Sequence, residues 1–256
     1  MIVKNYKGFL IDLDGTIYRG KERIDSAVEF VHKLAEKGLP YLFVTNNSSK
    51  TPEQVANTLE GFGVSATSEQ IITSSLATAD YIYEQKQEAN VFMIGEEGLK
   101  NALEKKGFAL SDENVDYVII GIDRAITYEK LAKACLAVRN GAELISTNAD
   151  KAIPTERGLV PGNGAITSVV STSTGVTPIF IGKPEPIIIG QALKRLGVGK
   201  EDAIMIGDNY DTDILAGINS GLDTLLVHTG VTTKEQLLVV KKQPTYVCDS
   251  LEEFVI

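Results

Sequence analysis

Short apolar runs alternate with segments of helical periodicity from one end of the chain to the other. The runs are rich in β-branched and aromatic residues, and they read FLID, YLFVTN, VFMIG, YVIIG, ELISTN, PIFIG, AIMIGD and TLLVHTG. Nearly continuous apolar runs of this kind are typical of parallel strands that are buried on both faces and joined by crossover helices. The pattern therefore predicts an α/β fold built on parallel sheets.

The segment DSAVEFVHKLAEKG, residues 25–38, shows the helical pattern most clearly. Its apolar residues recur at helical spacing, Asp25 is a candidate N-cap, and Gly38 ends the pattern. We expect this segment to form an amphipathic crossover helix. The same periodicity predicts further helices near residues 52–61, 97–106, 128–140, 185–197 and 213–220.

No long Gly-, Ser- or Pro-rich linker divides the chain, but two weaker features suggest a domain boundary. One is the polar stretch EQKQEAN at residues 84–90, and the other is the turn GKPEP at residues 182–186. The segment between them contains strand-like runs of its own and is long enough, at about 95 residues, for a small domain. We expect this segment to form an inserted domain.

Composition and charge limit the kinds of binding partner and the cellular compartment that we expect for this protein. A chain of 256 residues with 43% hydrophobic residues suits a soluble globular protein, and its net charge of −9 disfavours nucleic acid or an anionic membrane as partner. No apolar run reaches the roughly 18 residues of a membrane span, and the N-terminus lacks a signal-peptide pattern. Cys135 and Cys248 have no neighbouring ligand at zinc spacing, so we expect reduced thiols in a cytoplasmic protein.

Polar residues directly after the apolar runs are the candidate site residues, because ligands of parallel sheets gather outside the carboxyl ends of the strands. These residues combine acids, amides, a hydroxyl and an ammonium group, and they are Asp12, Asp14, Thr45, Asn46, Asn47, Lys183, Asp208 and Asp213. Carboxylates gathered at one place repel one another unless a cation lies among them. Magnesium, which prefers carboxylate, water and phosphate oxygens, is the natural occupant.

The chemistry of these residue types suits phosphoryl transfer. Asp12, Asp208 and a main-chain carbonyl near Asp14 suit a magnesium ion, and a remaining oxygen of Asp12 suits a nucleophile. Asp14 suits an acid that protonates a leaving alcohol and later activates water. Thr45, the main-chain amide after it and Lys183 offer donors and positive charge to phosphoryl oxygens.

The same stretches, in the same order, resemble the four motifs of the haloacid dehalogenase superfamily: DLDGT, FVTNNSS, GKPEP and GDNYDTD. The stretches GIDRAITYEKL, STNAD and GLVPGNGA further resemble its NagD-like branch, which includes nitrophenyl phosphatases, phosphoglycolate phosphatases and acid sugar phosphatases. The resemblance implies a Rossmann-like, doubly wound core formed by residues 1–80 and 182–256. It also implies an α/β cap domain inserted at residues 81–181.

The resemblance implies a role for each of the four acids. Asp12 would be the nucleophile and a metal ligand, and Asp14 would be the acid and base that also binds the metal through its carbonyl. Asp208 would be the third metal ligand, and Asp213 would orient metal-bound water or Lys183. The implied metal is Mg²⁺.

The resemblance also implies the substrate site and the reaction. Thr45, Asn46, Asn47 and Lys183 would bind the phosphoryl group. The expected activity is a magnesium-dependent phosphatase that hydrolyses small phosphate monoesters through a phosphoaspartyl intermediate at Asp12. Sugar and acid-sugar phosphates, phosphoglycolate-like esters and aryl phosphates are the expected substrates, because the cap region contains few aromatic residues that could stack on a nucleobase.

Two alternatives stay open at this point. The first is a nucleoside monophosphate phosphatase. The second is a non-enzymatic phosphoacceptor or phosphate-binding regulator, because receiver domains also combine acids, a Thr and a Lys at the ends of parallel strands. A homo-oligomer is neither required nor excluded by the sequence.

Polar residues of the predicted cap loops form a second group of candidates. Arg124, Asn148 and Asp150 lie in loops that could reach the site, although polar loop residues are more often merely solvated. The stretch GNGAIT at residues 162–167 begins like a dinucleotide-binding fingerprint but lacks the third glycine. We interpret it as the turn that begins a helix.

Overall fold

The computed structural model describes residues 4–256, and this part of the chain divides into two compact units. The first unit comprises the described residues up to Thr45, together with Pro52–Ile72 and Lys183–Ile256, and the second comprises Asn46–Thr51 and Thr73–Gly182. The predicted boundary at residues 80 and 81 falls inside helix α3 (Ser74–Gln85). Residues 1–3 of the predicted first domain lie outside the described residues.

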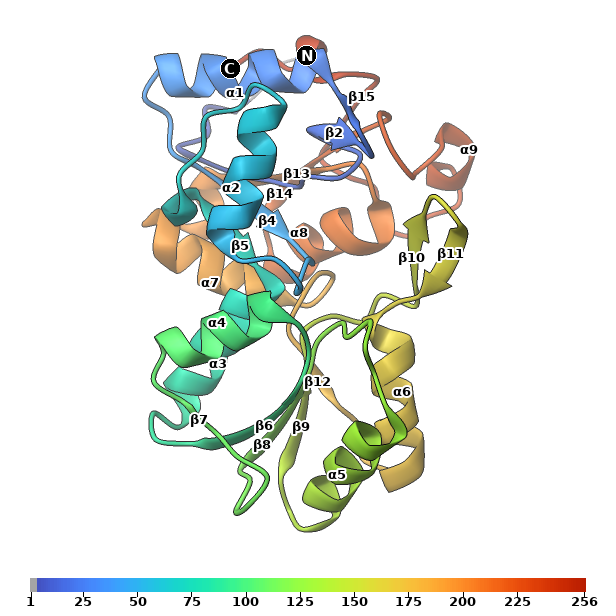
Figure 1. The fold of residues 1–256 in the computed structure, drawn as a ribbon. Coiled ribbons are helices and arrows are strands. Elements are labelled where there is room, and N and C mark those ends of the chain that lie inside the picture. Colours follow the sequence, from blue (N-terminus) through green and yellow to red (C-terminus); the bar gives the residue numbers. More distant parts are fainter. Residues whose placement is uncertain (1–3) are drawn as a thin grey trace. The chain divides into compact units, whose positions relative to one another are not determined.

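A six-stranded sheet forms the centre of the first unit, in the order β15-β14-β13-β1-β4-β5 over the described residues (Figure 1). The strands are β1 (Gly8–Ile11), β4 (Tyr41–Thr45), β5 (Ile71–Thr73), β13 (Ala203–Gly207), β14 (Asp223–Val227) and β15 (Tyr246–Cys248). From β1 the chain adds β4 and β5 on one side, and later adds β13, β14 and β15 on the other. This doubly wound topology confirms the predicted α/β class.

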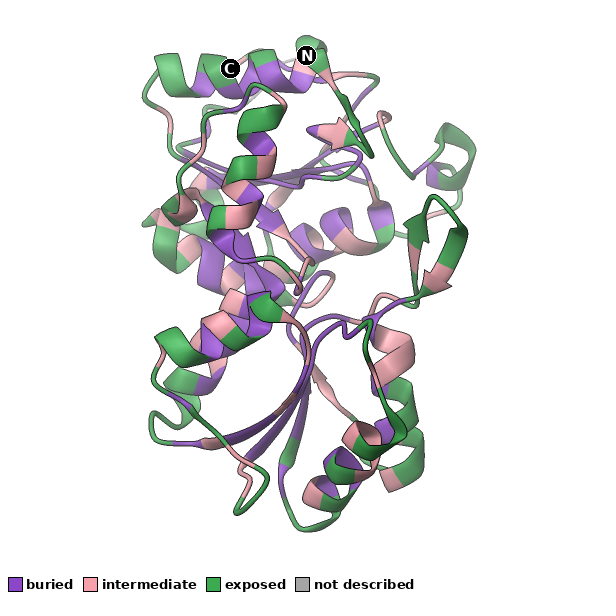
Figure 2. Cartoon of the chain, viewed as in Figure 1, coloured by how far each residue is buried: buried purple, intermediate pink, exposed green. Residues whose placement is uncertain are grey.

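Helices cover both faces of this sheet, which explains why its strands are mostly apolar (Figures 1 and 2). Phe9 and Ile11 pack with α1 and α2, whereas Met205 faces α8, where Gly217 comes close to its side chain. The helices of this unit are α1 (Asp25–Glu36), α2 (Pro52–Gly61), α7 (Pro186–Leu196), α8 (Leu215–Ser220) and α9 (Lys234–Leu237). A short antiparallel hairpin, β2 (Tyr18–Arg19) and β3 (Glu22–Arg23), follows β1.

Helix α1 begins at the residue that was predicted to be its cap, so its N-cap lies one residue earlier than predicted. Ile24 occupies the N-cap without a side-chain hydrogen bond, so the prediction that Asp25 is the N-cap is wrong. Asp25 is instead the first helical residue, where its negative charge still interacts favourably with the helix dipole. Gly38 lies just beyond the C-cap with φ +64°, as a residue that ends a helix often does.

A five-stranded parallel sheet forms the centre of the second unit, in the order β12-β9-β8-β6-β7 over the described residues. Its strands are β6 (Asn90–Ile94), β7 (Ala109–Leu110), β8 (Tyr117–Ile120), β9 (Glu143–Ser146) and β12 (Ile179–Phe180). Helices α5 (Tyr128–Arg139) and α6 (Asn163–Thr174) pack on one face, and α3 and α4 (Glu97–Lys105) lie on the other (Figure 1). An antiparallel hairpin, β10 (Ala152–Thr155) and β11 (Gly158–Pro161), precedes α6.

One smaller prediction is also confirmed by the fold. Gly162 is the N-cap of α6, which confirms that GNGAIT begins a helix. Cys135 and Cys248 are both buried and form no disulfide. Among the described residues, none of the helices combines the length and the apolar character that crossing a membrane requires.

Candidate active site

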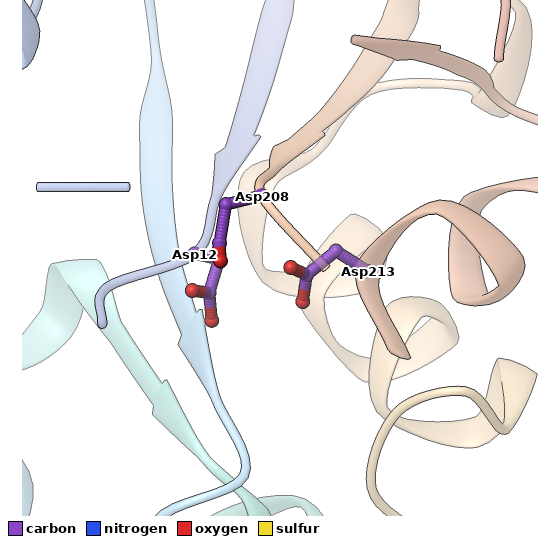
Figure 3. Close-up of side chains that lie close together, drawn as sticks. All are labelled: Asp12, Asp208 and Asp213. Carbon is purple, nitrogen blue, oxygen red and sulfur yellow. The ribbon is translucent and has the colours of Figure 1, made fainter. Parts of the chain in front are cut away.

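Three buried aspartates of the first unit meet at the carboxyl end of its sheet (Figure 3). Asp12 directly follows β1 and Asp208 directly follows β13, and these neighbouring strands flank the point where the chain switches its direction of winding. Such a switch point is where open α/β sheets bind ligands. Asp213 comes from the helical turn Tyr210–Ile214, and in the described part of the chain one carboxylate oxygen of each aspartate lies within 4.8 Å of the others.

Lys183 joins two of these aspartates, although it begins far away in the sequence. Its Nζ donates to Oδ1 of Asp12 at 2.5 Å and to Oδ1 of Asp213 at 2.7 Å. A third hydrogen bond, 2.9 Å long, reaches the main-chain oxygen of Val44 in β4. The side chain of Lys183 is only 2% exposed, so this ammonium group is held by acceptors rather than by water.

Asp208 is held from both sides by the neighbouring loops. Its Oδ2 accepts a 2.7 Å hydrogen bond from the main-chain amide of Val231, and its Oδ1 accepts one of 3.3 Å from Oγ1 of Thr16. Two glycines leave room for this carboxylate. A Cβ atom at Gly15, which has φ +92°, would lie 2.3 Å from Oδ2 of Asp208, and one at Gly230 would lie 1.9 Å from it.

The cluster contains more carboxylates than positively charged groups. Burial and repulsion from Asp213 raise the pKa of Asp12 well above its usual range, against the pull of Lys183. The same two causes raise the pKa of Asp208 to about 6. Burial alone would lower the pKa of the Lys183 ammonium, but attraction from Asp12 and Asp213 outweighs it and the pKa is raised.

This donor set fits a hard divalent cation. Asp12, Asp208 and Asp213 provide three carboxylates around one ammonium group, so the cluster keeps a net negative charge when all three are ionised. Oxygen ligands with uncompensated negative charge are what a magnesium-sized cation requires. The cluster of three aspartates is therefore the candidate metal centre, within which Asp213 also pairs with Lys183.

The structure does not bring Asp14 into the carboxylate cluster. Its side chain is exposed and accepts a 3.4 Å hydrogen bond from the main-chain amide of Gly20. Thr45 is half-buried at the end of β4, one residue after the carbonyl that binds Lys183. Asp12, Lys183, Asp208 and Asp213 are thus the predicted site residues that contact or approach one another in the first unit.

Asn46 and Asn47 belong to the second unit. Asn47 shapes its own turn, because its Oδ1 accepts from the main-chain amides of Ser49 at 3.0 Å and Lys50 at 2.9 Å. The side-chain amide of Asn46 donates to Asp150, at 3.2 Å for the shorter of two contacts. Asp150 thus has a specific partner among the predicted site residues.

The comparison with protein-family models decides the family. Residues 9–109 match a model described as haloacid dehalogenase-like hydrolase, and residues 180–254 match one described as HAD-hydrolase-like. The chain belongs to the haloacid dehalogenase-like hydrolases. The matched segments contain Asp12, Lys183, Asp208 and Asp213, and so they contain every side chain of the buried cluster.

Close relatives of this hydrolase are phosphatases. It is 58% identical over 253 residues to the 5′-nucleotidase YutF of Bacillus subtilis, with 99% of each chain covered. It is 56% identical over 254 residues to the acid sugar phosphatase of Staphylococcus aureus, covering 99% of this chain and 98% of the relative. A solved structure of a double mutant of the thermostable NPPase of Geobacillus stearothermophilus superimposes with a TM-score of 0.94 at 61% identity, covering 99% of both chains. This hydrolase is therefore a phosphatase that acts on phosphate monoesters.

Several contacts that build the phosphatase site were not among the sequence predictions. The carbonyl of Val44 and the amide of Val231 are main-chain groups, so no side-chain motif reveals them. Thr16 lies inside the DLDGT motif, and its hydrogen bond to Asp208 depends on two strands meeting in the sheet. Gly230, directly after the run TLLVHT, offered a signal, because a glycine at that place often marks a close approach of the main chain.

Proposed function

We propose that this phosphatase hydrolyses small phosphate monoesters through a phosphoaspartyl intermediate at Asp12, with a bound magnesium ion. The observation that carries the proposal is the buried cluster at the switch point of the first sheet. There a lysine joins Asp12 and Asp213, and Asp208 lies beside them. Such a cluster combines a nucleophile, a cation site and a fixed positive charge at one place.

Asp12, Asp208 and the main-chain carbonyl of Asp14 would hold the metal ion, and Asp213 would keep Lys183 in place. When bound, a divalent cation polarises phosphoryl oxygens and neutralises charge that builds on them. Thr16, Val231 and the close-packed glycines keep the Asp208 carboxylate in one orientation, which supports this assignment.

In the first half of the proposed reaction, a carboxylate oxygen of Asp12 attacks the phosphorus atom. The bond from phosphorus to the ester oxygen breaks, and Asp14 donates a proton to the departing alcohol oxygen. The ammonium group of Lys183 stabilises the negative charge of the transferred phosphoryl group. The exposed position of Asp14 suits this role, because the acid must face the substrate rather than the carboxylate cluster.

In the second half, the Asp14 carboxylate accepts a proton from a water molecule whose oxygen attacks the phosphorus atom. The bond between phosphorus and Asp12 breaks, which releases inorganic phosphate and restores the Asp12 carboxylate. Thr45 and the main-chain amide of Asn46 would donate hydrogen bonds to the phosphoryl oxygens in both steps. The turn that Asn47 shapes would present that amide.

We further propose that the first unit is the catalytic core and that the second unit is the cap that selects the leaving alcohol. Sugar and acid-sugar phosphates, phosphoglycolate-like esters and aryl phosphates are the proposed substrates, and the name of the acid sugar phosphatase relative supports the first of these classes. A nucleoside monophosphate is the second candidate, and the relative described as a 5′-nucleotidase favours it.

Phosphate release from a panel of esters tests the proposal. The panel contains p-nitrophenyl phosphate, sugar phosphates, phosphoglycolate and nucleoside monophosphates, each with magnesium and with chelator. We expect magnesium-dependent release by the parent protein and none by Asp12→Asn, with both proteins folded by circular dichroism. Release by Asp12→Asn at the parental rate would contradict the proposal, and the ranking of the esters would decide between the two substrate classes.

A further inference from the structure

A network of polar side chains in the second unit fixes both the side chain and the main chain of Asn46. The side-chain Nδ2 of Asn46 donates to Asp150, at 3.2 Å to Oδ1 and 3.4 Å to Oδ2. Its main-chain oxygen accepts from Nδ2 of Asn148 at 2.8 Å and from Oγ of Ser74, also at 2.8 Å. Residues far apart in the sequence thus determine where Asn46 lies.

The loop that carries Asn148 and Asp150 is itself held firmly. Asn148 is 4% exposed, and its Oδ1 accepts a 3.1 Å hydrogen bond from the main-chain amide of Asp150. Its main-chain oxygen accepts from Nδ2 of Asn163, the first residue of α6, at 2.9 Å. The same Nδ2 also reaches the hydroxyl groups of Ser146 and Thr147, so the end of β9 and the start of α6 are joined.

The atoms around this network are closely packed. A Cβ atom at Gly182 would lie 2.5 Å from Oδ1 of Asn46 and 2.7 Å from the main-chain oxygen of Thr147. The main-chain oxygen of Asp150 accepts a 2.9 Å hydrogen bond from the amide of Gly164 in α6. Polar groups packed this closely have few alternative arrangements, which is a property of preorganised sites.

We propose that Asn148 and Asp150 are positioning residues for the phosphate-binding turn at residues 45–47, and that they act through Asn46. This inference rests on the proposed function. The side chain of Asn46 would anchor the turn to Asp150, while its main-chain amide donates to the phosphoryl group. A carboxylate repels a phosphate ester, so Asp150 suits the role of an anchor behind the amide better than that of a phosphate ligand.

Substitutions at Asp150 test this role, because its side chain is half-buried and is not among the buried core residues. Asp150→Ala removes the acceptor of Asn46. We expect the KM for p-nitrophenyl phosphate and the inhibition constant of inorganic phosphate to rise together, on the order of 10-fold. Asp150→Asn keeps an acceptor oxygen, and we expect it to stay within roughly 3-fold of the parent.

A double-mutant cycle with Asn46→Ala shows whether Asp150 acts through Asn46. We expect Asp150→Ala to change phosphate affinity much less in the Asn46→Ala background than in the parent. The matched control is Asp112→Asn, which removes an exposed carboxylate of the same unit that pairs with Lys133, and it should leave both constants unchanged. Phosphate affinity is measured by calorimetry as well as by inhibition.

The possible outcomes each decide the inference. Independent, multiplying effects of Asn46→Ala and Asp150→Ala would overturn it. An effect of Asp150→Ala on sugar phosphates alone, with p-nitrophenyl phosphate and inorganic phosphate unaffected, would also overturn it and would make Asp150 a leaving-group contact. A parent protein that binds phosphate but hydrolyses no ester would contradict the proposed function, while the calorimetric cycle would still test the network.

Discussion

At the scale of single residues, the site is a problem of charge balance. Asp12, Asp208 and Asp213 are buried close together, and Lys183 provides a single positive charge between two of them. Burying ionised carboxylates so close together carries a free-energy penalty, and a bound cation reduces this penalty. The raised pKa values of Asp12 and Asp208 reflect this penalty, because burial and repulsion disfavour the ionised forms.

Removal of the lysine tests that balance. Lys183→Met leaves Asp12 and Asp213 without their ammonium partner, so we expect the free energy of unfolding to fall by about 3–5 kcal/mol. We expect kcat/KM to fall by a factor on the order of 100 or more, because the fixed positive charge is lost. Chemical denaturation and ester hydrolysis measure the two effects. Lys133→Met, at an exposed ion pair, is the control, and equal behaviour of the two variants would refute this explanation.

The raised pKa of Asp208, about 6, predicts how magnesium binding depends on pH. Below this value the carboxyl group holds a proton that a cation must displace, so we expect the magnesium-induced rise in Tm to shrink from about pH 7.5 to about pH 5. Without metal, this group makes the protein less stable as pH rises from 3.8 to about 6, because the folded state binds the proton more tightly. Thermal unfolding with and without magnesium measures the effect, and an equal rise in Tm at both pH values would count against it.

At the scale of elements, the site depends on strand ends and on the loops that follow them. The loop after β14 contributes the amide of Val231 to Asp208 and brings Gly230 against the same carboxylate. The hydroxyl of Thr229 donates a 2.7 Å hydrogen bond to the main-chain oxygen of Gly15, next to Asp14. This loop carries no acid of its own, yet it determines how the Asp208 carboxylate is oriented.

A pair of glycine substitutions tests the role of this loop. The Cβ atom of Gly230→Ala would lie 1.9 Å from Oδ2 of Asp208, so we expect weaker magnesium binding and at least a 10-fold loss of kcat/KM. Gly190→Ala in α7 meets no atom within 4 Å and should instead raise stability by about 0.5–1 kcal/mol without loss of activity. Parental magnesium affinity in Gly230→Ala would contradict the role of the loop.

Some elements were predictable from the sequence and others were not, for physical reasons. The strands β1, β4, β8 and β13 are continuous apolar runs, and the structure confirms each of them. Helix α3 escaped prediction, because it buries small or hydroxyl-bearing residues such as Ser74, Ser75 and Thr78 in place of an apolar stripe.

At the scale of the whole molecule, the chain builds each unit from separated segments. The first unit takes β1 and β4 from the start of the chain and β13, β14 and β15 from its end. The order of the four motifs made the meeting of Asp12, Lys183 and Asp208 predictable. The assignment of the segment Asn46–Thr51 to the second unit was not predictable, because it rests on tertiary hydrogen bonds such as the one from Asn148 to Asn46.

The central claim is that Asp12 carries the phosphoryl group during turnover. Rapid acid quenching during hydrolysis of p-nitrophenyl phosphate, followed by mass mapping of peptides, tests it most directly. We predict an acid-stable, hydroxylamine-sensitive phosphoryl group on the peptide that contains Asp12, present during turnover and absent in Asp12→Asn. Sustained turnover with no phosphorylated peptide, or with the phosphoryl group on another residue, would contradict the account.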